Sequence, residues 1–122
     1  MKTLRIAVVA AALVLTASAA HAQKAALGTW DVTTVSPEGE FKSVMEVRED
    51  AGQLIAVGKS PQGERKYDSV AVEGSNITMV MTIDYNGSPM TITYVGKIDG
   101  SKIDGTTDYG GLATGTFSAA KQ

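Results

Sequence analysis

The sequence predicts an all-β domain, a single antiparallel up-and-down meander of about eight strands closed into a small barrel. Three observations support this prediction. Beyond residue 22, apolar and polar residues alternate with period two, and no long stretch has the helical period. The alternating runs are rich in Thr, Val, Ile and Tyr, which strands prefer. Short clusters of Gly, Asp, Asn, Ser and Pro separate the runs and are typical of tight turns.

Eight runs are predicted as strands. They are residues 27–35, 41–48, 53–59, 65–72, 76–85, 89–98, 102–107 and 112–119. Because every connection is short, strands that are adjacent in sequence are expected to pair antiparallel. Asn86-Gly87 and Asp99-Gly100 are the sharpest turn signals, since both central residues of a type I′ hairpin turn have positive φ.

Closure into a barrel is expected because an open meander leaves two unpaired edges. The strongest alternation predicts one inward face on two neighbouring strands. Its residues are Ile77, Met79, Met81, Ile83 and Tyr85, then Met90, Ile92, Tyr94, Gly96 and Ile98. A two-sheet β-sandwich is the alternative, because periodicity does not separate the two folds. Regular strand spacing and the lack of a long Greek-key connection favour the barrel.

The first residues predict export. Basic residues precede a continuous apolar run over residues 6–17, and Ala20 and Ala22 form the small-x-small pattern of a signal-peptidase site. We therefore expect a signal peptide at 1–22 and one mature domain at 23–122, in the periplasm or secreted by the Sec route. The apolar run is shorter than the roughly 20 residues of a membrane-spanning helix, so no integral membrane anchor is expected.

Charge and cysteine content narrow the partners. Without the predicted signal peptide, nine basic residues remain against thirteen acidic ones, a formal charge of −4. This balance argues against nucleic acid, whose binding needs clustered Lys and Arg. The chain has no cysteine, so its stability is expected to come from the sheet and its packing rather than from disulfides.

Catalytic and metal chemistry is largely excluded by residue type. The single histidine, His21, lies in the predicted signal peptide, which leaves the mature domain without His or Cys. Nucleophilic systems that need those residues, and zinc sites built from them, are therefore excluded. The acids lie at outward positions or turns, and Asp99, Asp104 and Asp108 fit no calcium-loop spacing. We expect no enzyme, no metal site and no cofactor.

Two short segments carry a resemblance to a known superfamily. Gly28-Thr29-Trp30 resembles the Gly-x-Trp opening of calycins, the superfamily of lipocalin, fatty-acid-binding and avidin barrels. The C-terminal segment 115–121, which ends in Lys121, is similar to their last strand and its following basic residue. The resemblance implies a lipocalin-like barrel in which Lys121 packs over Trp30 and closes one end. Binding-site tryptophans of avidins are missing, so biotin binding is not implied.

The four methionines beyond residue 22 all fall on predicted inward positions. Their flexible thioethers predict either a soft-walled ligand cavity or gap-filling in a closed core. The predicted ligand-lining residues are Met45, Met79, Met81, Met90, Ile92 and Tyr94. Phe41 and Tyr85 have the same two interpretations. Tyr67 and Tyr109, near turns, are candidates for the rim of an opening.

The sequence thus predicts an exported, non-enzymatic binding protein that encloses a small apolar or amphipathic ligand. The alternative is a protein-interaction, adhesion or inhibitor module of the bacterial envelope, with a filled barrel core and an exported protein as its partner. A carrier requires an internal space that reaches solvent. An interaction module requires a filled core and an apolar patch outside, and it would engage its partner through loops or an uncovered strand edge.

Overall fold

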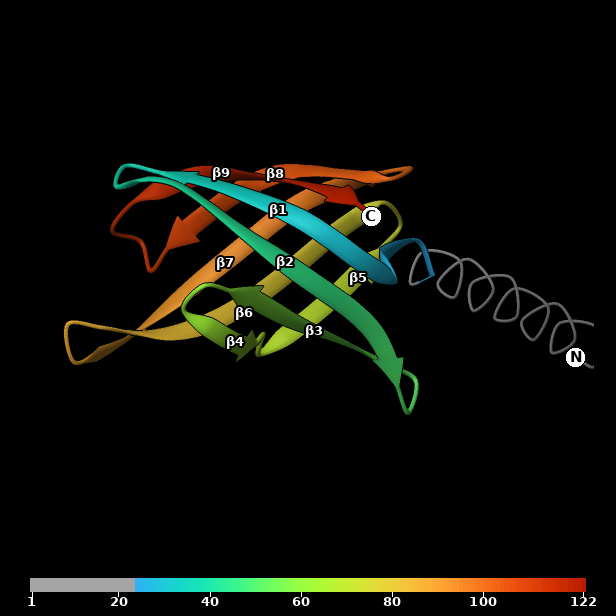
Figure 1. Ribbon diagram of the computed structural model, residues 1–122, viewed down its shortest axis with the longest axis horizontal. Coiled ribbons are helices and arrows are strands. Elements are labelled where there is room, and N and C mark those ends of the chain that lie inside the picture. The colour runs from blue at the N-terminus through green and yellow to red at the C-terminus, as the bar shows by residue number, and fades with distance from the viewer. Residues whose placement is uncertain (1–23) are drawn as a thin grey trace, which may run out of the picture.

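The computed structural model describes residues 24–122, so the predicted signal peptide lies outside the described residues. The described chain forms one nine-stranded β-sheet, preceded by a helical turn at residues 24–26 (Figure 1). The strands are β1 Gly28–Ser36, β2 Gly39–Asp50, β3 Gln53–Ser60, β4 Gly63–Lys66, β5 Ser69–Glu73, β6 Asn76–Tyr85, β7 Ser88–Asp99, β8 Lys102–Tyr109 and β9 Thr114–Lys121. The all-β prediction is confirmed.

The predicted antiparallel meander is also confirmed. The strand order in the sheet is β4-β3-β2-β1-β9-β8-β7-β6-β5, and every pairing is antiparallel. The first and last strands pair in the middle of this order, where Trp30 is opposite Lys121 and Val32 is opposite Ala119. The first and last strands therefore lie inside the sheet rather than at its edges.

Closure of a hydrogen-bonded barrel was predicted wrongly. The predicted strand over 65–72 is divided into β4 and β5, because the backbone N–H groups of two consecutive residues within it donate hydrogen bonds to two different strands. Tyr67 N donates to Ala56 O of β3 at 2.9 Å, and Asp68 N donates to Val80 O of β6 at 2.7 Å. Among the described strands, β4 and β5 are the two ends of the sheet order and do not pair with each other. The two-sheet sandwich is wrong as well, since all nine strands belong to one sheet.

The sheet curls on itself, so that β1 and β2 cross in front of β6 and β7 (Figure 1). The concave face holds the core, as the alternation predicts. Ile77, Met79, Ile92 and Ile98 are all buried, which confirms the inward face of β6 and β7. Tyr85, predicted on that same face, is exposed.

A row of aromatic rings crosses the concave face. Gly96 of β7 pairs with Gly105 of β8, and Gly105 pairs with Phe117 of β9. The Phe117 ring lies across both glycines, where an added Cβ would come within 2.9 Å of it at Gly96 and 2.6 Å at Gly105. Tyr94 meets Phe117 edge-to-face at 5.5 Å, and Tyr67 meets Tyr94 at 5.6 Å between ring centroids. The row links β9 to the point where β4 gives way to β5.

Gly105→Ala should destabilise the fold strongly. The added Cβ would clash with Val95 O and lie 2.6 Å from the Phe117 ring. Because this overpacks the interior, the free energy of unfolding should fall by about 2–3 kcal/mol. Urea unfolding of the mature protein measures this loss. Gly58→Ala is the control, since its Cβ would meet Tyr67 at an ordinary 3.5 Å. Equal unfolding midpoints for the two variants would contradict this account of the core.

Candidate ligand-binding site

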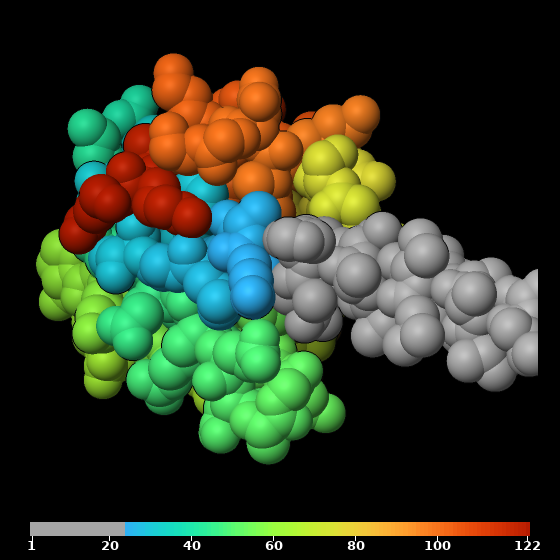
Figure 2. Space-filling model, turned by 90° about the vertical axis from the view of Figure 1, so that its right-hand side faces the viewer, coloured from blue at the N-terminus to red at the C-terminus, as the bar shows by residue number. Residues whose placement is uncertain are grey.

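One end of the rolled sheet is sealed. Trp30 is 0% exposed, and its Nε1 donates to Ala26 O at 2.9 Å. Lys121 Nζ lies 5.0 Å from the centroid of the Trp30 ring and donates to Ala25 O at 3.2 Å. Gly28, with φ of 129°, leaves room for the Lys121 side chain to lie across the backbone. The first described residues and the C-terminus lie side by side at this end (Figure 2).

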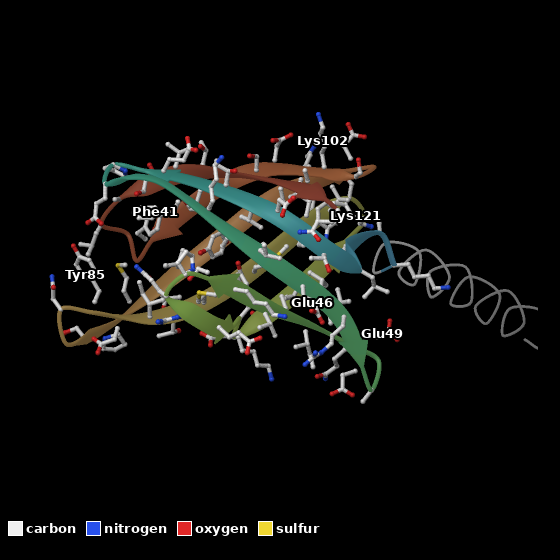
Figure 3. The ribbon with its side chains drawn as sticks, viewed as in Figure 1. Phe41, Glu46, Glu49, Tyr85, Lys102 and Lys121 are labelled. Atoms are coloured by element: carbon white, nitrogen blue, oxygen red, sulfur yellow. The ribbon has the colours of Figure 1, made fainter. Side chains whose placement is uncertain are left out.

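The other end of the rolled sheet is open. Phe41 is on the same face of β2 as buried Met45, and Tyr85 is on the same face of β6 as buried Met81. Both nevertheless remain exposed, by 52% for Phe41 and 42% for Tyr85. They lie together at the end opposite Lys121 (Figure 3). Inward-facing aromatic side chains that reach solvent mark this end as uncovered.

A hollow lies at the open end. Its volume is about 440 Å³, which falls within the range of small-molecule sites. The lining comes from the β6–β7 hairpin and the β8–β9 loop, through Tyr85, Ser88, Pro89, Met90, Thr91, Gly110 and Leu112. Met90 packs against the core, whereas Leu112 is 79% exposed. The hollow therefore lies at the surface, beside the edge of the apolar core.

The β1–β2 hairpin approaches the same rim. Tyr85 Oη donates to Glu38 Oε1 at 3.4 Å, which links the tip of β6 to the turn between β1 and β2. Phe41 follows that turn on β2. Four connections of the chain lie at this end: the β1–β2, β3–β4 and β6–β7 turns and the β8–β9 loop.

A second hollow, of about 560 Å³, lies over β1, β2 and β3. Its lining includes Asp31, Lys42 and Lys59, which are exposed and alternate with inward-facing neighbours. Lys59 is held by Glu46 and Glu64 at 3.6 and 3.7 Å. The charged residues of this hollow lie on the outer face of the sheet, and of its lining residues only Val32 belongs to the buried core. We therefore take the open end, where inward-facing aromatic side chains are exposed, as the better candidate site.

The structure separates the six predicted ligand-lining residues. Five of them are buried in the core: Met45, Met79, Met81, Ile92 and Tyr94. Met90 is partly buried and lines the hollow at the open end. Sequence reasoning missed Pro89 and Gly110 as lining residues and placed Leu112 in a strand, whereas β9 begins at Thr114. No periodic signal marks these positions, because they lie at strand ends and in a loop.

Hydroxyl groups lie within the apolar interior. Tyr67, predicted as a rim residue, is instead buried. Burial, and then the neighbouring Tyr109, raise the pKa of Tyr94 to about 12. Burial and the neighbouring Tyr94 likewise raise the pKa of Tyr67. Thr107, opposite Tyr94, is buried with its Oγ1 lacking a hydrogen-bond partner among the described residues. These neutral hydroxyls are the polar groups that the interior offers.

The charged side chains lie mostly on the outside. Thr82 Oγ1 donates to Asp68 Oδ2 at 2.6 Å, and Arg48 pairs with Glu46 at 3.6 Å, both at the surface. Within residues 24–122, no three His, Cys, Asp or Glu side chains converge on a point that could hold a metal ion. None of the helical residues in this range form a segment long and apolar enough to cross a membrane.

The Lys121–Trp30 contact should stabilise the fold measurably. Lys121→Met keeps most of the aliphatic length and removes the cation, so we expect a loss of about 0.5–1 kcal/mol in the free energy of unfolding. Lys121→Arg retains a cation over the ring and should keep most of this stability. Chemical unfolding of the three proteins tests it, and equal stability of the Met variant would refute the contribution.

Stability should fall steeply in alkaline solution. The pKa of Tyr94 is raised from 10.0 to about 12 on folding, so the folded state binds its proton more tightly than the unfolded state does. The stabilisation is complete below pH 10 and is lost as the pH rises towards 12. Unfolding measured over this range should show a smaller loss for Tyr94→Phe. An unchanged pH dependence in that variant would count against a buried phenol.

Comparison with known proteins assigns no family. No protein-family model matches the chain, and no curated protein matches it either.

Proposed function

We propose that the protein is an exported, non-enzymatic binding protein that takes a small apolar or amphipathic ligand at the open end of its rolled sheet. One observation carries the proposal. Phe41 and Tyr85 face inward and are still 52% and 42% exposed, whereas Trp30 at the other end is fully buried. A ligand at the open end would cover the apolar side chains that the fold itself leaves in water.

Such covering would favour reversible binding. Burying a large apolar side chain contributes about 1.5–3 kcal/mol when it is complete. Phe41, Tyr85 and Leu112 are each covered only in part, so each offers a fraction of that amount. Met90 adds a flexible wall that adapts to ligands of different shape.

In this proposal the fold works as a calycin-like barrel. The sheet ends at β4 and β5 are joined by the chain at Tyr67 and Asp68, whose amides bind β3 and β6 respectively. The contact of Lys121 with Trp30 supports the same comparison. The protein would act in the periplasm or outside the cell, where the predicted signal peptide directs it.

A protein-interaction module is the second candidate, and one observation favours it. All four residues of β4 are exposed, and β4 pairs with β3 along one side. An extended segment of an exported partner could add to such an edge. This candidate requires a partner chain at β4 and does not require anything at the open end.

Native mass spectrometry of the mature protein, exported in its own host and purified without detergent, tests the leading proposal. We expect a reproducible adduct of small-molecule mass. Phe41→Gln should reduce its occupancy, because the substitution removes an apolar wall of the open end. Val95→Gln is the matched control, since Val95 is 49% exposed but faces outward from β7.

Two outcomes would count against the ligand proposal. One is bare protein that also fails to bind added alkyl ligands. The other is an adduct that both substitutions reduce equally. A stable complex with a second protein, lost when β4 is altered, would favour the interaction module.

A further inference from the structure

We infer that Met90 is an oxidation site, at which hydrogen peroxide or a similar two-electron oxidant converts the thioether to a sulfoxide and thereby weakens ligand binding at the open end. The oxidation itself goes beyond the proposed function and depends only on the fold. The effect on binding rests on the proposed function, because Met90 lines the hollow.

The four methionines beyond residue 22 differ in how far the fold covers them. Met45 and Met79 are 0% and 1% exposed, and Met81 is 8% exposed. Met90 is only partly buried, and it lines the surface hollow of about 440 Å³. The reactivity of a sulfur group towards dissolved oxidants follows its exposure. Of these four methionines, Met90 is therefore the one that such an oxidant reaches first.

The β8–β9 loop places only backbone next to the Met90 side chain. A Cβ added at Gly110 would meet Met90 Cγ at 3.2 Å and Met90 Sδ at 4.0 Å. Gly110 has a φ of 62°, a conformation that favours glycine over residues with a side chain. Because no side chain projects from this position, Gly110 puts none over the thioether.

The reaction at Met90 is the transfer of one oxygen atom. A sulfur lone pair attacks one oxygen of hydrogen peroxide, the O–O bond breaks, and a sulfur–oxygen bond forms. The proton of the transferred oxygen passes to the other oxygen, which leaves as water. The sulfur is thus oxidised by two electrons and the peroxide is reduced. The chain has no cysteine, so methionine thioethers are its only sulfur groups.

The sulfoxide would change the wall of the hollow. Methionine sulfoxide is polar, whereas the thioether is apolar. An apolar ligand that packs on the oxidised side chain would have to displace water from the sulfoxide oxygen, and burying a polar group without a hydrogen bond costs free energy. Oxidation of Met90 should therefore weaken the binding of an apolar group in the hollow.

Peptide mapping by mass spectrometry after peroxide treatment tests the oxidation. The mature protein is treated with hydrogen peroxide under native conditions and again in urea, and is then digested. In the native protein we expect sulfoxide to form at Met90 about tenfold faster than at the three buried methionines. In urea all four should react at similar rates. Equal rates in the native protein, or a preference for Met90 that persists in urea, would overturn the inference.

Calorimetric titration with dodecyl maltoside, below its micelle-forming concentration, tests the effect on binding. Peroxide treatment that oxidises Met90 should weaken binding to the native protein about threefold to tenfold. Met90→Leu removes the thioether and keeps an apolar side chain, so the affinity of this variant, whatever its value, should not change on treatment. Met81→Leu is the matched control, because it retains Met90 and should lose affinity as the native protein does.

The outcomes separate the inference from the proposed function. If peroxide oxidises Met90 and leaves maltoside binding unchanged, or if Met90→Leu also loses affinity on treatment, the effect on binding is overturned while ligand binding stands. If the maltoside does not bind the untreated protein and Phe41→Gln changes nothing, the proposed function is lost and the effect on binding with it. The oxidation site itself is then decided by the peptide mapping alone.

Discussion

The stacking of Phe117 across Gly105 and Gly96 is the contact on which the rest of the structure depends. Because Gly96 and Gly105 lie on the concave face, β7, β8 and β9 can curl without crowding. The Phe117 ring fills the space that larger side chains at these two positions would occupy. Tyr94 packs edge-to-face on that ring, and Tyr67 packs on Tyr94. At Tyr67 and the next residue, Asp68, the backbone changes its hydrogen-bond partner from β3 to β6. The aromatic row thus brings the far ends of one sheet back onto its middle.

The two ends of the roll differ because the first described residues and the C-terminal residues lie at only one of them. Residues 24–26 and Lys121 cover Trp30 there, through a hydrogen bond to the indole and a cation over its ring. The opposite end has turns and a loop, whose tips are linked by the Tyr85–Glu38 hydrogen bond but do not cover the interior. The strand order explains this difference, because β1 begins and β9 ends at the same end of the sheet. The residues that flank these two strands therefore cover the apolar face at that end only.

The alternation of apolar and polar residues predicted strand positions and buried faces. It placed β6 at 76–85 as the structure has it, and it predicted the burial of Ile77 and Met79. It missed the division of the predicted strand into β4 and β5 at Tyr67. The alternation of apolar and polar residues predicts which face of the sheet a residue occupies, but it does not predict which strand the residue's backbone amide will bind. For the same reason it predicted Tyr85 as inward without showing that this end is uncovered. Loop residues such as Leu112 carry no periodic signal at all.

The exposure of Phe41 and Tyr85 is difficult to explain by folding alone. A small domain without cysteine has little stability to spare, and a Thr at either position would keep the strand pattern while placing less apolar surface in water. Under the proposed function, a bound ligand would cover this apolar surface. Departures from what the fold requires tend to gather at functional sites. Under the proposed function, the exposed aromatic side chains at the open end are such a departure.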